Sequence, residues 1–117
     1  MSTQVYGAVN RNGSVLIAGS GDWTAQRMAA GTYEVTFTTP FAIQPVVVVS
    51  GYIPREQGGS ASDNTFSVGP IKEGSFMVRT YDVVSRIVFD KEKQEVVSDN
   101  AGEAQDSEFT FIAIGGR

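Results

Sequence analysis

The spacing of apolar residues limits this chain to β-strands. No stretch of twelve residues carries apolar side chains at the i, i+3, i+4 and i+7 positions of an amphipathic helix, whereas alternation with a period of two recurs. The clearest case is 33–38, where Tyr33, Val35 and Phe37 would share one face of a strand. We predict an all-β fold of seven to nine short strands, as in a sandwich or barrel.

Turn residues divide the chain into the expected strands. An Asn-Gly pair at the end of 10–13 suits a tight hairpin turn, and two prolines bracket a corner at 40–45. The expected strands are 4–9, 14–18, 23–28, 33–38, 44–52, 65–72, 75–83 and 109–114, the last lying centrally in a sheet. Two further short strands, 86–89 and 95–97, could flank a charged turn at 90–93, and we predict polar loops at 54–64 and 98–108.

The length of the chain indicates a single domain. A chain of 117 residues buries enough surface for one core, so we expect a single β-sandwich domain over 1–117, with loose ends near 1–3 and 115–117. No basic segment followed by an apolar run begins the sequence, and no apolar run is long enough to span a bilayer. We expect a soluble protein without membrane insertion, whose location, inside the cell, outside it or on a particle, stays open.

The composition argues against most catalytic chemistry. The chain contains neither histidine nor cysteine, which removes Ser–His–Asp and Cys–His nucleophiles as well as histidine and thiolate metal sites. A pair of carboxylates remains for glycoside hydrolysis, drawn from Asp22, Asp63, Asp82 and Asp90. The net charge of −4 is the wrong sign for binding a phosphate backbone, so we expect no nucleic acid partner. Because histidine and cysteine are absent, we also expect no enzymatic activity.

A run of four valines indicates contact with another subunit. Val46, Val47, Val48 and Val49 are continuously apolar, a pattern that predicts burial on both faces of a strand. In an antiparallel protein of this size, the second face could be covered by another copy of the chain. We therefore predict that these valines form an oligomer interface.

Several short segments resemble known fibre domains. GAVNRNGSV at 7–15, GTYEVTF at 31–37 and the proline-bracketed stretch 40–47 are similar to the terminal β domains of phage tail fibres and bacterial collagen-like surface fibres. GSFMV at 74–78 and FTFIAIG at 109–115 resemble the closing half of H-type lectins. The resemblance covers about 5–115 and implies an antiparallel β-sandwich that assembles as a homotrimer with a sugar pocket near the subunit boundary.

The resemblance suggests a function and leaves two alternatives. Our leading expectation is a lectin-like homotrimer that binds carbohydrate and serves in adhesion, since three weak sites act together on a repeating surface. The first alternative is a purely structural module that trimerises or caps a larger fibre or particle without a ligand. The second is a small enzyme that uses carboxylates, Arg and Tyr. The chain departs from the lectins in having Phe111 where they place a tryptophan, and in lacking the histidine that commonly lines their pocket.

Five side chains are the candidates for sugar binding. Trp23, the single tryptophan, could stack on the apolar face of a sugar, or it could anchor the core. Arg79 and Tyr81 lie two apart in a strand similar to one that supplies polar ligands in H-type lectins, although Arg79 could instead pair with a carboxylate across the sheet. Tyr52 and Arg55, beside the first polar loop, form a second candidate pair.

An acidic stretch near the C-terminus contains oxygen ligands that calcium prefers. The residues concerned are Asp99, Asn100, Glu103, Asp106 and Glu108. They lack the glycine-pinned spacing of an EF-hand loop, and a solvated loop explains them as well. We expect no cofactor and no metal.

Overall fold

A computed structural model describes the backbone at 2–52, 64–90 and 95–116, and the side chains at 3–52, 65–81 and 104–116. Within these ranges the chain forms nine strands and no helix. The strands are β1 Ser2–Val9, β2 Val15–Ile17, β3 Trp23–Ala29, β4 Thr32–Phe37, β5 Val46–Gly51, β6 Asn64–Ile71, β7 Ser75–Asp90, β8 Glu95–Ala104 and β9 Phe109–Gly116.

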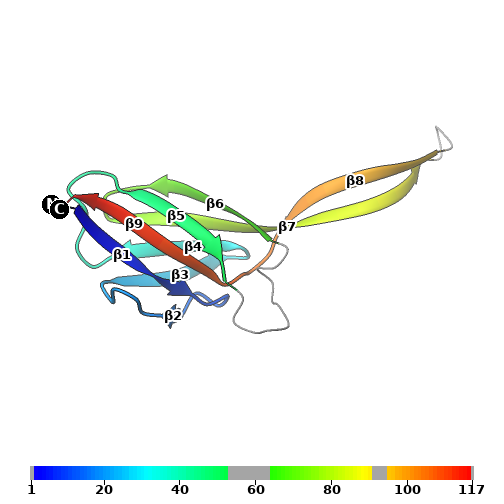
Figure 1. Cartoon of the computed structure of the whole chain (residues 1–117). Helices are drawn as coiled ribbons and strands as arrows, with labels where there is room; N and C mark the ends of the chain where they lie inside the picture. The colour runs from blue at the N-terminus through cyan, green and yellow to red at the C-terminus, as the bar shows by residue number, and fades with distance from the viewer. Residues whose placement is uncertain (1, 53–63, 91–94, 117) are drawn as a thin grey trace.

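The strands form two antiparallel sheets packed face to face (Figure 1). The first sheet has the order β2-β1-β9-β5, and the second has the order β3-β4-β7-β6, with β8 added to β7. Each described pairing is antiparallel. The prediction of an antiparallel β-sandwich is confirmed, and β9 is central in its sheet as expected.

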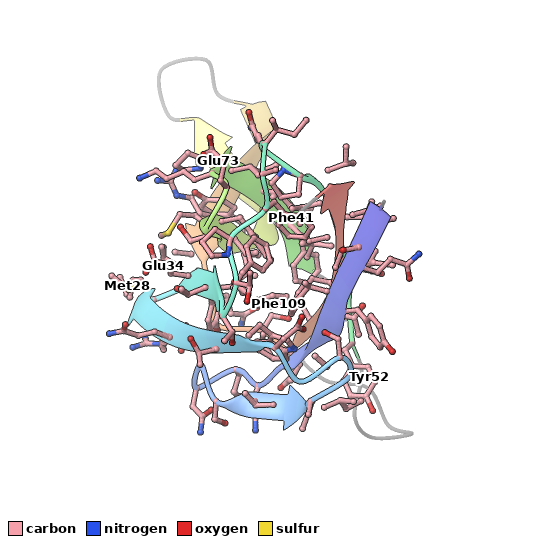
Figure 2. The ribbon with its side chains drawn as sticks, turned by 90° about the vertical axis from the view of Figure 1, so that its left-hand side faces the viewer. Met28, Glu34, Phe41, Tyr52, Glu73 and Phe109 are labelled. Atoms are coloured by element: carbon pink, nitrogen blue, oxygen red, sulfur yellow. The ribbon has the colours of Figure 1, made fainter. Side chains whose placement is uncertain are left out.

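Alternating apolar residues build the core between the sheets. Tyr33, Val35 and Phe37 of β4 are all buried, which confirms the predicted alternation. The view along the long axis shows Phe41 and Phe109 between the two sheets (Figure 2). Aromatic rings of the two sheets meet edge to face; the ring centroids of Tyr33 in β4 and Phe109 in β9 lie 5.3 Å apart at an interplanar angle of 64°. This geometry joins the sheets more firmly than area burial alone.

The turns mostly follow the sequence prediction. Gly13 takes the positive φ expected in the hairpin between β1 and β2, where its amide donates to the carbonyl of Asn10. The two ends of the chain pair with one another, since Ser2 lies opposite Gly116, although we expected loose ends there. The predicted loop at 54–64 lies almost wholly outside the described residues, and β6 already begins at Asn64.

A long hairpin extends beyond the sandwich, where the sequence predicted short strands and an acidic loop. Strand β7 runs on to Asp90, and its residues 81–90 pair with the whole of β8. Residues 98–104 are therefore strand, and only 105–108 connects β8 to β9. We call residues 82–90 of β7 together with β8 the arm (Figure 1). The arm accounts for the elongated shape of 62 × 31 × 22 Å. Asp99–Ala104 has the composition of a loop, but pairing with an already formed strand overrides local propensity.

Candidate functional site

The outer face of the first sheet is apolar and exposed. The register places Tyr6, Ile112 and Val48 in one row across β1, β9 and β5, and Gln4, Ile114 and Val46 in the next row. We define the apolar face as Tyr6, Ile17, Val46, Val48, Ile112 and Ile114. All except Ile112 expose between 39% and 69% of their surface. Contiguous apolar patches of this kind mark interaction sites.

The four valines of β5 alternate rather than being buried on both faces. Val47 and Val49 pack against the core, whereas Val46 and Val48 point outward onto the apolar face. The predicted burial on both faces stays a prediction that needs a second subunit, because no element of the described chain covers this side of the first sheet. Only the outward valines are available to a partner.

A pocket of about 270 Å³ opens beside Tyr6 on the same sheet. It is lined by residues of β1, β2, the turn after β2 and β9: Tyr6, Gly7, Ala8, Ile17, Gly19, Thr110 and Phe111. Two glycines of the lining allow neighbouring groups to approach closely. A Cβ at Gly7 would collide with the ring of Trp23 beneath the strand, and Gly19, at φ +57°, lies against the backbone of Tyr6. The missing Cβ atoms therefore let the ring of Trp23 and the loop after β2 lie directly against β1.

Trp23 lies under this pocket and belongs to the core. It is 5% exposed, and its ring meets Phe111 edge to face at 4.9 Å between centroids. Its Nε1 donates to the carbonyls of Tyr6 and Ala18 at 3.1 and 2.8 Å, which fixes the loop after β2 over β1. The sugar-stacking hypothesis for Trp23 is corrected, because the ring is not exposed in this chain.

The outer face of the second sheet is mostly polar. The exposed or half-buried side chains on this side include Thr24, Gln26, Thr32, Glu34, Thr36, Ser67, Arg79 and Tyr81, with Met28 and Met77 as apolar exceptions. Figure 2 shows Met28 and Glu34 on this side. The two outer faces of the sandwich thus differ in chemistry, and only the first resembles the core of a protein interface.

Arg79 and Tyr81 share this polar face, as their spacing predicted. Their side chains point to the opposite face of β7 from the buried side chains of Val78 and Thr80. In the register Arg79 lies between Thr32 of β4 and Ser67 of β6. Among the described side chains Arg79 forms no ion pair, so the alternative of a carboxylate across the sheet finds no support in that part of the chain.

The remaining candidates for sugar binding do not lie near Arg79 and Tyr81 in the described structure. Tyr52 follows β5 on the opposite side of the molecule from Glu34 (Figure 2), and its amide donates to the carbonyl of Glu108. Arg55 lies outside the described residues. With Trp23 in the core, the structure joins only Arg79 and Tyr81.

A polar network fixes the connection between the arm and the sandwich. Nε of Arg27 donates to Oδ2 of Asp106 at 2.8 Å, and the amide of Gly31 donates to Oδ1 at 2.8 Å. The pKa of Asp106 is lowered, because these hydrogen bonds outweigh its desolvation, which alone would raise it. Thr80 also donates to the carbonyl of Gln105. An isolated two-stranded hairpin is marginally stable in water, so this anchorage positions the arm.

Glu108 and Tyr33 continue the network into the core. Glu108 has a side chain only 2% exposed, and Nε of Arg11 lies 2.5 Å from its Oε1. The hydroxyl of Tyr33 donates to the carbonyl of Arg11 and accepts from the amide of Ser107. Burial, as the largest cause, raises the pKa of Tyr33 to about 12. These groups are committed to structural contacts.

The calcium hypothesis loses two of its ligands to this network. Asp106 and Glu108 pair with Arg27 and Arg11, while the side chains of Asp99, Asn100 and Glu103 lie outside the described set. Across the described residues, no three acidic side chains gather as they would around a metal ion. In the same part of the chain, no helix could cross a membrane.

Comparisons with protein-family models, with curated proteins and with solved structures found no match. The resemblance to fibre-tip domains and H-type lectins therefore stays a prediction. Function has to be argued from the chemistry of the two outer faces.

The sequence analysis missed the apolar face as a whole. Its signal was present in 109–116, where Phe109, Phe111 and Ala113 alternate with Ile112 and Ile114, so that both faces of the strand are apolar. A strand of this kind needs cover on two sides. The exposed ring of Tyr6 gave no separate signal, because single exposed aromatic residues are common.

Proposed function

We propose that this chain is a self-assembly module whose apolar face packs against further copies of itself. One observation carries the proposal: the outer face of the first sheet is apolar and exposed, whereas that of the second sheet is polar. Sheets packed face to face bury their apolar sides against each other. The apolar face thus supports a third layer supplied by another chain.

The size of the apolar face fits an interface core. Its exposed side chains present roughly 400 Å² of apolar surface, within the range of functional patches on soluble proteins. A standard interface buries about 800 Å² on each partner, with a polar rim around an apolar centre. A second copy offers the same apolar surface, so both sides gain from the contact. The resemblance favours three copies, and no catalytic activity is proposed.

The decisive experiment places a charge on each outer face in turn. Val48→Asp puts a carboxylate in the apolar face, and Thr24→Asp puts the same group on an exposed edge strand of the second sheet. We expect the wild type and Thr24→Asp to be oligomers by light scattering and sedimentation, and Val48→Asp to be monomeric but folded. A monomeric wild type, or an oligomer that survives Val48→Asp, would refute the proposal.

Carbohydrate binding is the second candidate function, supported by Arg79 and Tyr81 alone. They project from the same exposed side of β7, and a guanidinium and a phenol can hydrogen-bond to sugar hydroxyls. In an assembly that buries the apolar face, this polar face would stay accessible on every copy. A glycan array with wild type, Arg79→Ala and the control Gln26→Ala tests the idea. Binding lost only in Arg79→Ala supports it, and a silent array from an intact oligomer refutes it.

A further inference from the structure

The pocket and the outward valines lie on opposite sides of the apolar face. The pocket lies between β9 and the β1–β2 edge, whereas Val46 and Val48 stand on β5 at the other edge. They also lie at the same level along the strands, since Tyr6 at the pocket and Val48 share a row through Ile112. One side of the face is therefore hollow and the other carries exposed side chains.

A cyclic assembly brings these two sides together. When copies are related by rotation about an axis parallel to the strands, they keep the same level, and one edge of each face meets the opposite edge of its neighbour. The β5 edge of one copy then lies over the β1–β2 edge of the next. This holds for two copies as well as for three, because the rotation changes only the angle between the faces.

We infer that the pocket beside Tyr6 receives Val48 of the neighbouring copy, an inference that rests on the proposed self-assembly. Val48 is 57% exposed on an edge strand and has only a branched aliphatic group to offer. The pocket, at about 270 Å³, exceeds the roughly 150 Å³ of an engineered apolar cavity that holds benzene, so its volume is sufficient for a valine side chain.

The chemistry of the pocket supports an apolar occupant. Ile17, Ala8 and the ring of Tyr6 supply carbon surface, and the hydroxyl of Thr110 already donates to the carbonyl of Ser50. Anchor residues of interfaces typically fill such hollows near the centre of the contact, surrounded by less important contacts. In the assembly, Val48 of the neighbouring copy would be the anchor residue in the pocket, and the rest of the apolar face would surround this contact.

Cysteine cross-linking tests the inference directly, because the natural chain has no cysteine. The variant Ile17→Cys with Val48→Cys places one thiol at the pocket and one on β5. Thr24→Cys with Ser67→Cys is the matched control, with its thiols on the two edge strands of the second sheet. Under mild oxidation we expect the first variant to form covalent oligomers of the size measured by light scattering. The control should stay uncross-linked.

The outcomes separate this inference from the proposed function. If the wild type is an oligomer but the variant with cysteines at positions 17 and 48 forms no cross-links, the contact of Val48 with the pocket is refuted and self-assembly is not. A monomeric wild type refutes both the contact and self-assembly. Equal cross-linking of the control pair shows random collision and also overturns the anchor. If phenol shifts the emission of Trp23 while the oligomer stays whole, the pocket is open to a small ligand and Val48 does not occupy it.

A charge pair gives a second, independent measurement. Ile17→Glu and Val48→Lys should each dissociate the oligomer, since a lone charge is then buried against carbon. The double variant should recover assembly, because each carboxylate meets an ammonium of the neighbouring copy. Failure of the double variant to assemble, with both single variants folded, counts against the contact.

Discussion

Removing the cation that faces Glu108 should destabilise the fold more than any other surface truncation proposed here. In Arg11→Ala the Glu108 carboxylate, 2% exposed, loses a partner only 2.5 Å away. Breaking a fully buried pair costs about 3–5 kcal/mol. Arg11 is half in solvent, and Glu108 keeps a further interaction, so we expect a loss of about 2–3 kcal/mol.

The assay is thermal and urea unfolding at one fixed protein concentration, because association shifts apparent stability. For a domain of this size, the expected loss corresponds to a fall in Tm of about 10 °C. Arg27→Ala is the matched control, since Asp106 is more exposed and keeps the amide of Gly31 as a donor. The reasoning is refuted if Arg11→Ala is no more destabilising than Arg27→Ala.

Three further predictions concern the same end of the sandwich. Burial raises the pKa of Tyr33 to about 12, so folding favours the neutral phenol. The free energy of unfolding should therefore be constant below pH 10 and fall between pH 10 and 12. In urea unfolding measured across this range, Tyr33→Phe should show a smaller fall. The pKa of Asp106 is lowered, so its contribution should be present above its ordinary value of 3.8 and lost as the pH falls through the lower folded value, a loss absent in Asp106→Asn. Gly31→Ala should cost more than about 1 kcal/mol in urea unfolding, because φ is +65° and the new Cβ would lie 2.5 Å from the carbonyl oxygen of Thr80.

Local patterns were sufficient for much of the sandwich. The Asn-Gly turn and the alternation of Tyr33, Val35 and Phe37 place β1, β2 and β4 within a residue or two, because turn chemistry and period two are properties of short segments. The central position of β9 also followed from its apolar composition. These features need no knowledge of the partner strand.

Features that depend on distant segments were missed. The arm forms because 82–90 of β7 pairs with the polar strand β8, with Arg86 opposite Asp99. The sequence of β8 has no local pattern that predicts a strand of this length. The burial of Trp23 depends on Gly7, sixteen residues earlier, leaving room for its ring. Whether the outward Val46 and Val48 are buried depends on whether another layer covers the sheet, which one chain does not decide.

Strand β7 gives the arm a mechanical connection to the whole second sheet. It is one unbroken strand, paired within the sandwich with β4 on one side and β6 on the other, and it continues into the arm without a joint. A pull on the tip along the strand axis would stretch these hydrogen bonds in parallel, in shear, instead of opening them one by one. Rupture would then require many bonds to fail together, so tension applied at the tip would be transmitted to the body of the sandwich before the arm detached from it.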